Sequence, residues 1–139
     1  MTLKAAREIT DAAHSELLAY HQLYDIYNDY DGVTNLKTVN EWAGTAPVAV
    51  DARIMALLSF AKTMAEETGG RMNVAMGSVL SIWHDYRTKG LEDPASAALP
   101  TTEELQAAAE HADIDDLVLD PEAGTVFFAD PALQLDVGA

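Results

Sequence analysis

The spacing of apolar residues changes its period along the chain, and this change constrains the fold more than any other feature. Over residues 9–24 and 54–65, apolar residues recur at steps of three and four, which places them on one face of a helix. Later, Leu117–Asp120 and Thr125–Phe128 flank a Pro-Glu-Ala-Gly turn, which is typical of a β-hairpin. Helices followed by such strands predict an α+β fold.

Turn residues divide the helical part into segments. Residues 4–24 are expected to form an amphipathic helix, and residues 23–27 are either its last turn or a short strand. Residues 28–32 carry the Asn, Asp and Gly residues of a turn. A short helix is expected over residues 38–42, ending near Gly44.

A second long helix is expected after an extended segment at residues 47–50. Asp51 is the predicted N-cap, because its carboxylate can accept hydrogen bonds from free backbone N–H groups. Gly69 and Gly70 fit a glycine C-cap. A loop at residues 73–77 is then expected to lead into a short helix that ends near Trp83.

Residues 88–100 contain Gly90, Pro94 and Pro100 and predict a surface loop. A further helix is expected from residue 102 to about residue 111, capped by Thr101 or Thr102. Apolar and polar residues alternate over residues 133–136, which predicts another strand.

The length of 139 residues suits one domain, and the net charge is −15. So acidic a surface repels phosphate backbones, so nucleic-acid binding and anionic membrane surfaces are disfavoured. The chain has no cysteine, which excludes disulfides, thiol nucleophiles and zinc sites built on cysteine.

Several polar clusters have both a chemical and a structural interpretation. The histidines (His14, His21, His84, His111) lack metal-ligand spacing, so surface or packing roles are favoured over ligation. The acidic residues 113–116 and 28–31 lack the full calcium-loop pattern, so caps and turns are favoured over cation sites. Tyrosines around residues 24–30 could stack on a planar ligand or pack in the core. The small residues of 69–77 could approach a phosphate or merely connect two helices.

Taken in order, several segments resemble the ApbE family, the FAD:protein FMN transferases formerly called thiamine biosynthesis lipoproteins. The resemblance covers residues 17–139. Each segment alone is a weak signal, but their common order is specific. The segments are Leu23–Asn28, Asn35–Asn40, Pro47–Asp51, Thr68–Trp83 and Leu135–Ala139.

The resemblance implies a flavin site. A family tyrosine that contacts the flavin corresponds to Tyr27, or to Tyr30 if the loop register differs. The family loop that cradles FAD corresponds to Ala75, Met76 and Gly77.

Two further site positions lie at the C-terminal end of the sequence. A family aspartate that binds FAD corresponds to Asp136, and the backbone carbonyl of Ala139 corresponds to a ligand of Mg²⁺. A carbonyl oxygen is a hard ligand that suits this ion. The catalytic residues are unknown from this sequence, because the family supplies them from its C-terminal half.

The implied reaction transfers FMN from FAD to a threonine of a partner flavoprotein and releases AMP. Family partners include flavin-accepting subunits of membrane redox complexes, and the family is usually extracytoplasmic and anchored as a lipoprotein, although this chain shows no signal segment. The alternatives are an FAD-binding protein or FAD pyrophosphatase of the same family, or a non-catalytic interaction domain.

The family pattern is incomplete here. Its first strand and its C-terminal half find no counterpart, so residues 1–139 are expected to form one partial ApbE-like domain, inactive alone. The expected fold has about three main helices on a partial, mainly antiparallel sheet. Such a sheet leaves edges through which chains could self-associate.

Overall fold

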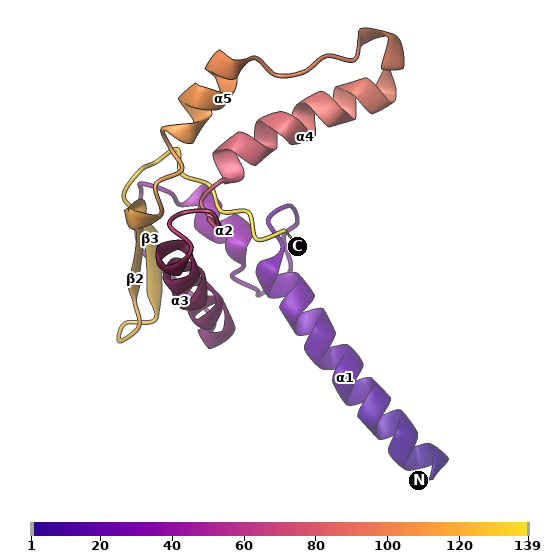
Figure 1. The fold of residues 1–139 in the computed structure, drawn as a ribbon. Helices are drawn as coiled ribbons and strands as arrows, with labels where there is room; N and C mark the ends of the chain where they lie inside the picture. The colour runs from indigo at the N-terminus through magenta and orange to yellow at the C-terminus, as the bar shows by residue number, and fades with distance from the viewer. Residues whose placement is uncertain (1, 139) are drawn as a thin grey trace.

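The computed structural model describes residues 2–138 and confirms an α+β fold (Figure 1). Two 3-10 turns, η1 (Pro94–Ser96) and η2 (Ile114–Asp116), accompany the regular elements. The helices are α1 (Leu3–Tyr24), α2 (Leu36–Glu41), α3 (Ala52–Glu67), α4 (Gly77–Glu92) and α5 (Thr102–Ala109), and the strands are β1 (Val48–Ala49), β2 (Leu117–Asp120) and β3 (Thr125–Phe128).

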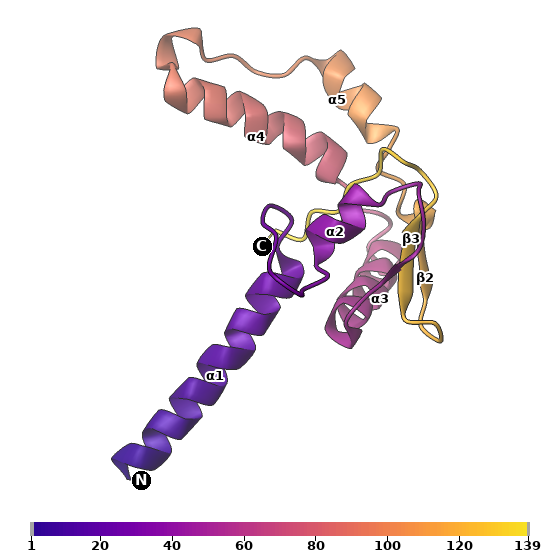
Figure 2. The ribbon, with the colours of Figure 1, turned by 180° about the vertical axis from the view of Figure 1, so that it is seen from behind.

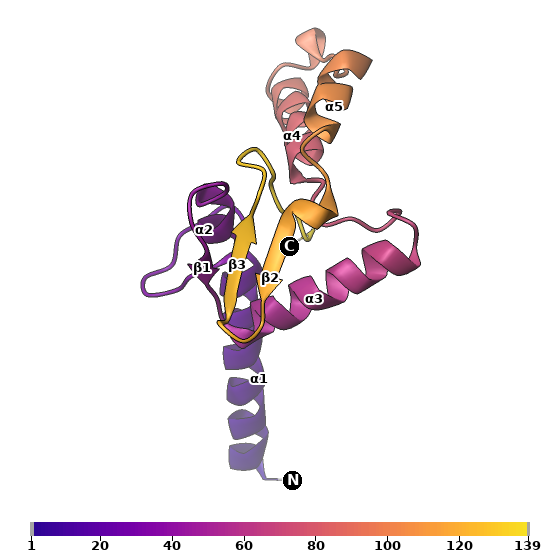
Figure 3. The same cartoon turned by 90° about the vertical axis from the view of Figure 1, so that its left-hand side faces the viewer.

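The sheet is antiparallel, with its three strands in the order β1-β3-β2 (Figure 3). The predicted hairpin is confirmed, with Leu117 opposite Phe128 and Asp120 opposite Thr125. Its turn is held by Asp120, whose carboxylate accepts hydrogen bonds from the backbone N–H groups of Glu122 and Ala123.

Helix α3 supplies the main helical side of the core against this sheet. Asp51 caps it as predicted, and Gly69 and Gly70 end it with positive φ angles of 62° and 79°. The core combines side chains from α2, α3, the sheet and the C-terminal segment. Its largest fully buried members include Leu36, Ile54, Leu58, Leu117, Phe128, Leu133 and Leu135. We call α2, α3 and the sheet the body.

Helix α1 extends away from the body over most of its length (Figure 2). Thr2 caps it, accepting a hydrogen bond from the N–H of Ala5. Only Leu23 is buried, whereas Ile9 and Leu17 are exposed. The helix was predicted correctly, but its apolar face contacts the body only near the C-terminal end. None of the described helices is long and apolar enough to cross a membrane.

Helices α4 and α5 pack together with η1 and form an arm, residues 77–109, that projects from the body (Figure 1). The prediction of a short helix followed by a loop from residue 88 was wrong, since α4 runs to Glu92. The sequence suggested a break at Gly90, but this glycine lies inside α4, where an added Cβ would make an ordinary contact of 3.4 Å with the Cβ of Ala97. Thr101, rather than Thr102, caps α5 through a capping box with Glu104.

Two other expectations need correction. The short helix α2 begins at Leu36 rather than Thr38, because the buried Asn35 side chain accepts a hydrogen bond from the N–H of Thr38 and acts as N-cap. Residues 133–136 do not form a strand. Gln134 makes a single bridge to Met76, and the Asn40 side chain hydrogen-bonds the backbone of Leu135.

Candidate functional site

An open cleft of about 370 Å³ lies where the C-terminal segment passes between α2 and α4. It brings together three of the residues predicted to contact FAD, namely Tyr27, Gly77 and Asp136. They come from segments far apart in sequence, so the fold assembles the cleft. The other lining residues include Ile26, Lys37, Asn40, Glu41, Ser81, His84 and Asp85.

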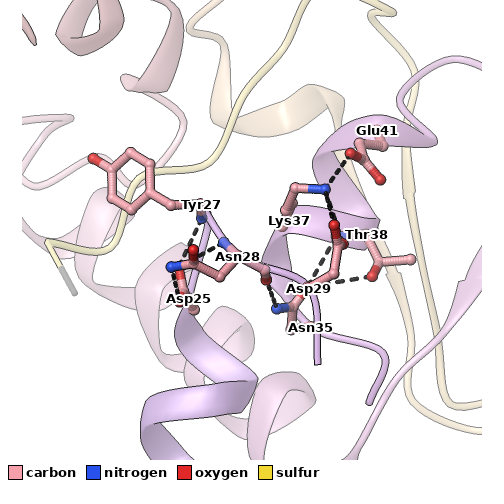
Figure 4. A network of polar contacts seen from close by, with 8 residues as sticks. All are labelled: Asp25, Tyr27, Asn28, Asp29, Asn35, Lys37, Thr38 and Glu41. Atoms are coloured by element: carbon pink, nitrogen blue, oxygen red, sulfur yellow. Dashed lines mark hydrogen bonds and ion pairs between the residues drawn. The ribbon is translucent and has the colours of Figure 1, made fainter. Parts of the chain in front are cut away.

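The buried carboxylate of Asp25 fixes the loop that carries Tyr27 (Figure 4). Its Oδ1 atom accepts hydrogen bonds from the backbone N–H groups of Tyr27 at 2.7 Å and Asn28 at 3.2 Å. Its Oδ2 atom accepts from the Asn28 side chain at 2.9 Å and from the Tyr30 hydroxyl at 2.7 Å. Asp25 therefore sets the direction in which the chain leaves α1.

These hydrogen bonds also determine the charge of Asp25. Burial alone would raise the pKa of its carboxyl, but the donors from Asn28, Tyr30 and the backbone hold that pKa well below its usual range. Asp25 is thus a fixed anion beneath the loop. The hydrogen bond that the Tyr30 hydroxyl donates to the Asp25 carboxylate in turn raises the pKa of that hydroxyl.

A second polar group connects this loop to α2 (Figure 4). The Asn35 side-chain amide donates to the carbonyl of Asn28 at 2.9 Å. Lys37 forms an ion pair with Asp29 at 2.8 Å and another with Glu41. The loop is consequently fastened at both ends, which keeps Tyr27 at the mouth of the cleft.

Gly77 begins α4 and lies against the C-terminal segment. Its N–H donates to the carbonyl of Gln134 at 3.0 Å, and an added Cβ would lie only 2.6 Å from that oxygen. Only glycine allows this approach. Of the neighbouring predicted positions, Ala75 is fully buried and Met76 pairs with Gln134, so neither lines the cleft.

Asn40 and Val74 position Asp136. The Asn40 amide donates to the carbonyl of Leu135 at 3.1 Å and accepts from its N–H at 2.8 Å. The N–H of Asp136 donates to the carbonyl of Val74 at 2.9 Å. These contacts replace the strand partner that the sequence pattern predicted, and they leave the Asp136 carboxylate in the cleft.

Tyr27 faces His84 across the cleft. The Tyr27 hydroxyl lies 3.4 Å from His84 Nδ1, and the ring centroids are 6.3 Å apart. The Tyr27 side chain is 56% exposed, so its ring is available to a ligand. Partial desolvation and the charge of Asp136 raise the pKa of its hydroxyl, which therefore stays protonated at neutral pH.

Two predicted positions do not join this cleft. The Tyr30 hydroxyl bonds Asp25 and lies 3.2 Å from His21 Nε2, and Tyr30 is not among the cleft residues. Ala139, the predicted magnesium ligand, lies outside the described residues. Asp113 caps η2, which agrees with the cap interpretation of that acidic cluster.

The residues that sequence reasoning missed are Lys37, Asn40, Ser81, His84 and Asp85. Lys37 and Asn40 stand in one of the family-like segments, so that segment was the available signal. For His84 the sequence offered only its residue type as a signal, because its partner Tyr27 is distant in sequence.

The charges of the cleft are mostly negative, from Glu41, Asp85 and Asp136. Lys37 is already paired with two carboxylates. Within residues 2–138, no group of three or more acidic or histidine side chains could hold a metal ion. The described residues therefore do not fit a complete magnesium site, and they offer an anionic ligand little positive charge.

Comparisons with known proteins assign the chain to a family. The ApbE family model matches residues 1–139, so the chain belongs to the ApbE family. An FAD:protein FMN transferase of Treponema pallidum (strain Nichols) is 34% identical over 111 residues, which are 75% of this chain and 28% of that relative.

Solved structures share the fold. The ApbE protein of Thermotoga maritima has a TM-score of 0.74 at 20% identity, covering 95% of this chain and 40% of its own. The flavinyl transferase ApbE of Pseudomonas stutzeri, in its apo form, has a TM-score of 0.68 at 18% identity, covering 98% and 39%. The chain thus spans well under half the length of these relatives.

Proposed function

We propose that this chain forms the flavin-binding part of a magnesium-dependent FAD:protein FMN transferase. The single observation that carries the proposal is the cleft, which gathers Tyr27, Gly77 and Asp136 from separate segments. Its volume of about 370 Å³ lies at the lower end of ligand sites, so it suits one ring system of FAD. Family membership supports FAD as the substrate.

Each cleft residue has a defined part in this proposal. The exposed ring of Tyr27 packs on the flavin, and its protonated hydroxyl can donate a hydrogen bond. The Asp136 carboxylate accepts hydrogen bonds from ligand N–H or O–H groups. The glycine at position 77 keeps the floor of the cleft open by allowing the segment at Gln134 to lie close.

The acidic surroundings support the requirement for Mg²⁺. FAD carries a negatively charged diphosphate, and the cleft carboxylates repel it. A bound magnesium ion would neutralise charge on the phosphates during transfer of FMN. Ala139 stays the proposed contributor from this chain, through its backbone carbonyl.

The proposed acceptor is a threonine of a partner flavoprotein, such as a flavin-carrying subunit of a membrane redox complex. The extracytoplasmic, lipid-anchored location is proposed on family resemblance alone. Hydrolysis of FAD to FMN and AMP is the alternative reaction, and the two reactions differ only in whether threonine or water receives FMN.

A product assay tests the function. The protein is incubated with FAD, Mg²⁺ and a threonine-bearing acceptor, and mass spectrometry follows the acceptor while chromatography follows AMP and FMN. Covalent FMN on the acceptor supports the transferase, and free FMN alone supports the hydrolase. FAD binding without either product would show that this chain binds the flavin but lacks catalysis.

Binding is measured separately by flavin fluorescence, with and without Mg²⁺. Tyr27→Ala is expected to weaken FAD binding by about tenfold, the usual size for losing one stacking aromatic. Phe60→Ala is the matched control, because Phe60 is equally exposed (55%, against 56% for Tyr27) but lies on α3 outside the cleft. Equal affinity of both variants for FAD would contradict the proposed role of Tyr27.

A further inference from the structure

The chain returns from the arm to the body through residues 110–113, which we call the return segment. The two ends of the arm are joined there, because the Ser78 hydroxyl at the start of α4 donates to the carbonyl of Ala108 in the last turn of α5 at 2.9 Å. The Asn73 side chain, which lies just before the arm, donates to the carbonyl of Ala112 at 2.8 Å. The base of the arm is therefore held by polar side chains.

His111 connects the return segment to the turn that follows β3. Its Nδ1 atom lies 2.7 Å from Oδ2 of Asp130, and Oδ1 of Asp130 accepts from the N–H of Ala132 at 2.7 Å. The Ala132 N–H and the His111 side chain both lower the pKa of the Asp130 carboxyl, so Asp130 is an anion at neutral pH. An ionised carboxylate can only accept hydrogen bonds, so Nδ1 of His111 carries the proton.

The turn at residues 129–132 leads directly into the segment that carries Asp136. The N–H of Leu133 donates to the carbonyl of Asp130 at 3.3 Å, and Leu133 is fully buried. On the other side of the turn Pro131 lies against Gly44, where an added Cβ would be only 2.5 Å from the Cβ of Pro131. The turn is thus fixed between the chain that follows α2 and the return segment of the arm.

This arrangement links the arm to the cleft without contacting a ligand, since neither His111 nor Asp130 lines the cleft. We propose that His111 and Asp130 are positioning residues for the flavin cleft. Their hydrogen bond fixes the start of residues 133–136 against the end of the arm, and so sets where Asp136 lies relative to the cleft residues of α4. This inference rests on the proposed function, and it adds two residues that act on FAD binding through the backbone.

Substitutions at His111 test whether the hydrogen bond matters, rather than the ring. His111→Phe keeps an aromatic ring but removes the nitrogen, and should raise the Kd of FAD by about tenfold, the order expected for losing a hydrogen bond to a charged group. His111→Asn places an amide nitrogen near the position of Nδ1 and should recover most of the affinity. His14→Phe is the matched control, because His14 is an exposed histidine of α1 that does not line the cleft. Flavin fluorescence measures each Kd.

A double variant tests whether His111 acts through Asp130. In an Asp130→Ala background the partner is already absent, so adding His111→Phe should leave the Kd of FAD unchanged. Hydrogen exchange without ligand gives a second readout that does not depend on FAD. His111→Phe should accelerate exchange at residues 132–137 and leave residues 52–67 of α3 unchanged, whereas a general loss of stability would accelerate both.

The outcomes separate the inference from the function on which it rests. If the wild type binds FAD and His111→Phe binds it equally well, the positioning role is wrong and the flavin cleft stands. The role is also wrong if His111→Asn recovers no affinity, if the effects of the two substitutions add, or if exchange at residues 132–137 does not change. If the wild type does not bind FAD, the proposed function and the inference both fail.

Discussion

The longest helix of the body and the longest helix of the arm have equal length, yet they bury their side chains to very different extents. Helix α3 of the body buries Ile54, Leu58, Ala61 and Ala65, whereas α4 of the arm, also 16 residues long, buries only Gly77 and Val79 near its start. Helix α5 buries none of its residues. Exposed apolar side chains of the arm, including Trp83, Leu91 and Leu99, face the solvent instead.

This difference indicates that the body provides stability and the arm provides a surface for binding. Burial in the body stabilises the fold and fixes the loops that carry Tyr27 and Asp136. The arm leaves its aromatic and apolar residues uncovered next to the cleft, where a ligand or partner can cover them. Substitutions in the body should therefore change stability, and substitutions in the arm should change binding.

The largest expected effect comes from removing core volume. Leu58→Ala creates a cavity at a fully buried position and should lower the free energy of unfolding by about 2–5 kcal/mol. Leu91→Ala, at a leucine of the arm that is 72% exposed, should change it by less than about 0.5 kcal/mol. Urea unfolding measures both, and equal losses would contradict the comparison.

The two glycines of α4 test the same comparison between packed and exposed positions. Gly77→Ala forces a Cβ against the Gln134 carbonyl at 2.6 Å and should destabilise the protein by about 1–3 kcal/mol while weakening FAD binding. Gly90→Ala has room at 3.4 Å and should stabilise α4 by about 0.5–1 kcal/mol. Thermal unfolding distinguishes them, and a stabilising Gly77→Ala would show that the close approach is unimportant.

Acid should weaken the loop at Asp25. Its pKa is lowered in the folded protein, so the stabilisation it provides is present above the unfolded pKa of about 4 and is lost as the pH falls below that value. Asp25→Asn should cost about 1–3 kcal/mol at pH 7, by unfolding in urea, and less at pH 3. Asp31→Asn, at a neighbouring exposed aspartate, is the control and should show little change at either pH.

The most local effect is expected at the start of α5. Thr101→Ala removes the capping box of α5 and should cost about 1 kcal/mol of local helix stability. Hydrogen exchange should accelerate in residues 102–109 but not in α3. Faster exchange throughout the body would mean that the two regions unfold together.

Local chemistry explains which elements the sequence could predict. Asp51, Gly69 and the hairpin turn act through neighbours in the chain, so their patterns were sufficient to place α3, β2 and β3. The path of residues 133–136 depends on Asn40, which hydrogen-bonds the backbone of Leu135. These two residues are far apart in sequence, and no local pattern predicts their contact.

The site residues likewise include some that the sequence predicted and some that it did not. Tyr27, Gly77 and Asp136 were predicted through family resemblance, and the fold brings them to one cleft. Ala75 and Met76 share a segment with Gly77, but Ala75 is fully buried and Met76 bridges Gln134, and neither lines the cleft. His84 could not be found from the sequence, because only the course of α4 past the Tyr27 loop makes it a neighbour of the cleft.

The most direct test of the central claim, that body and arm bind FAD together, is hydrogen exchange measured by mass spectrometry with and without FAD and Mg²⁺. The account predicts slower exchange at residues 25–28, at residues 134–137 and along residues 77–85 of the arm, with no change in residues 3–20 of α1. Unchanged exchange at residues 25–28 and 134–137 at saturating FAD would contradict it.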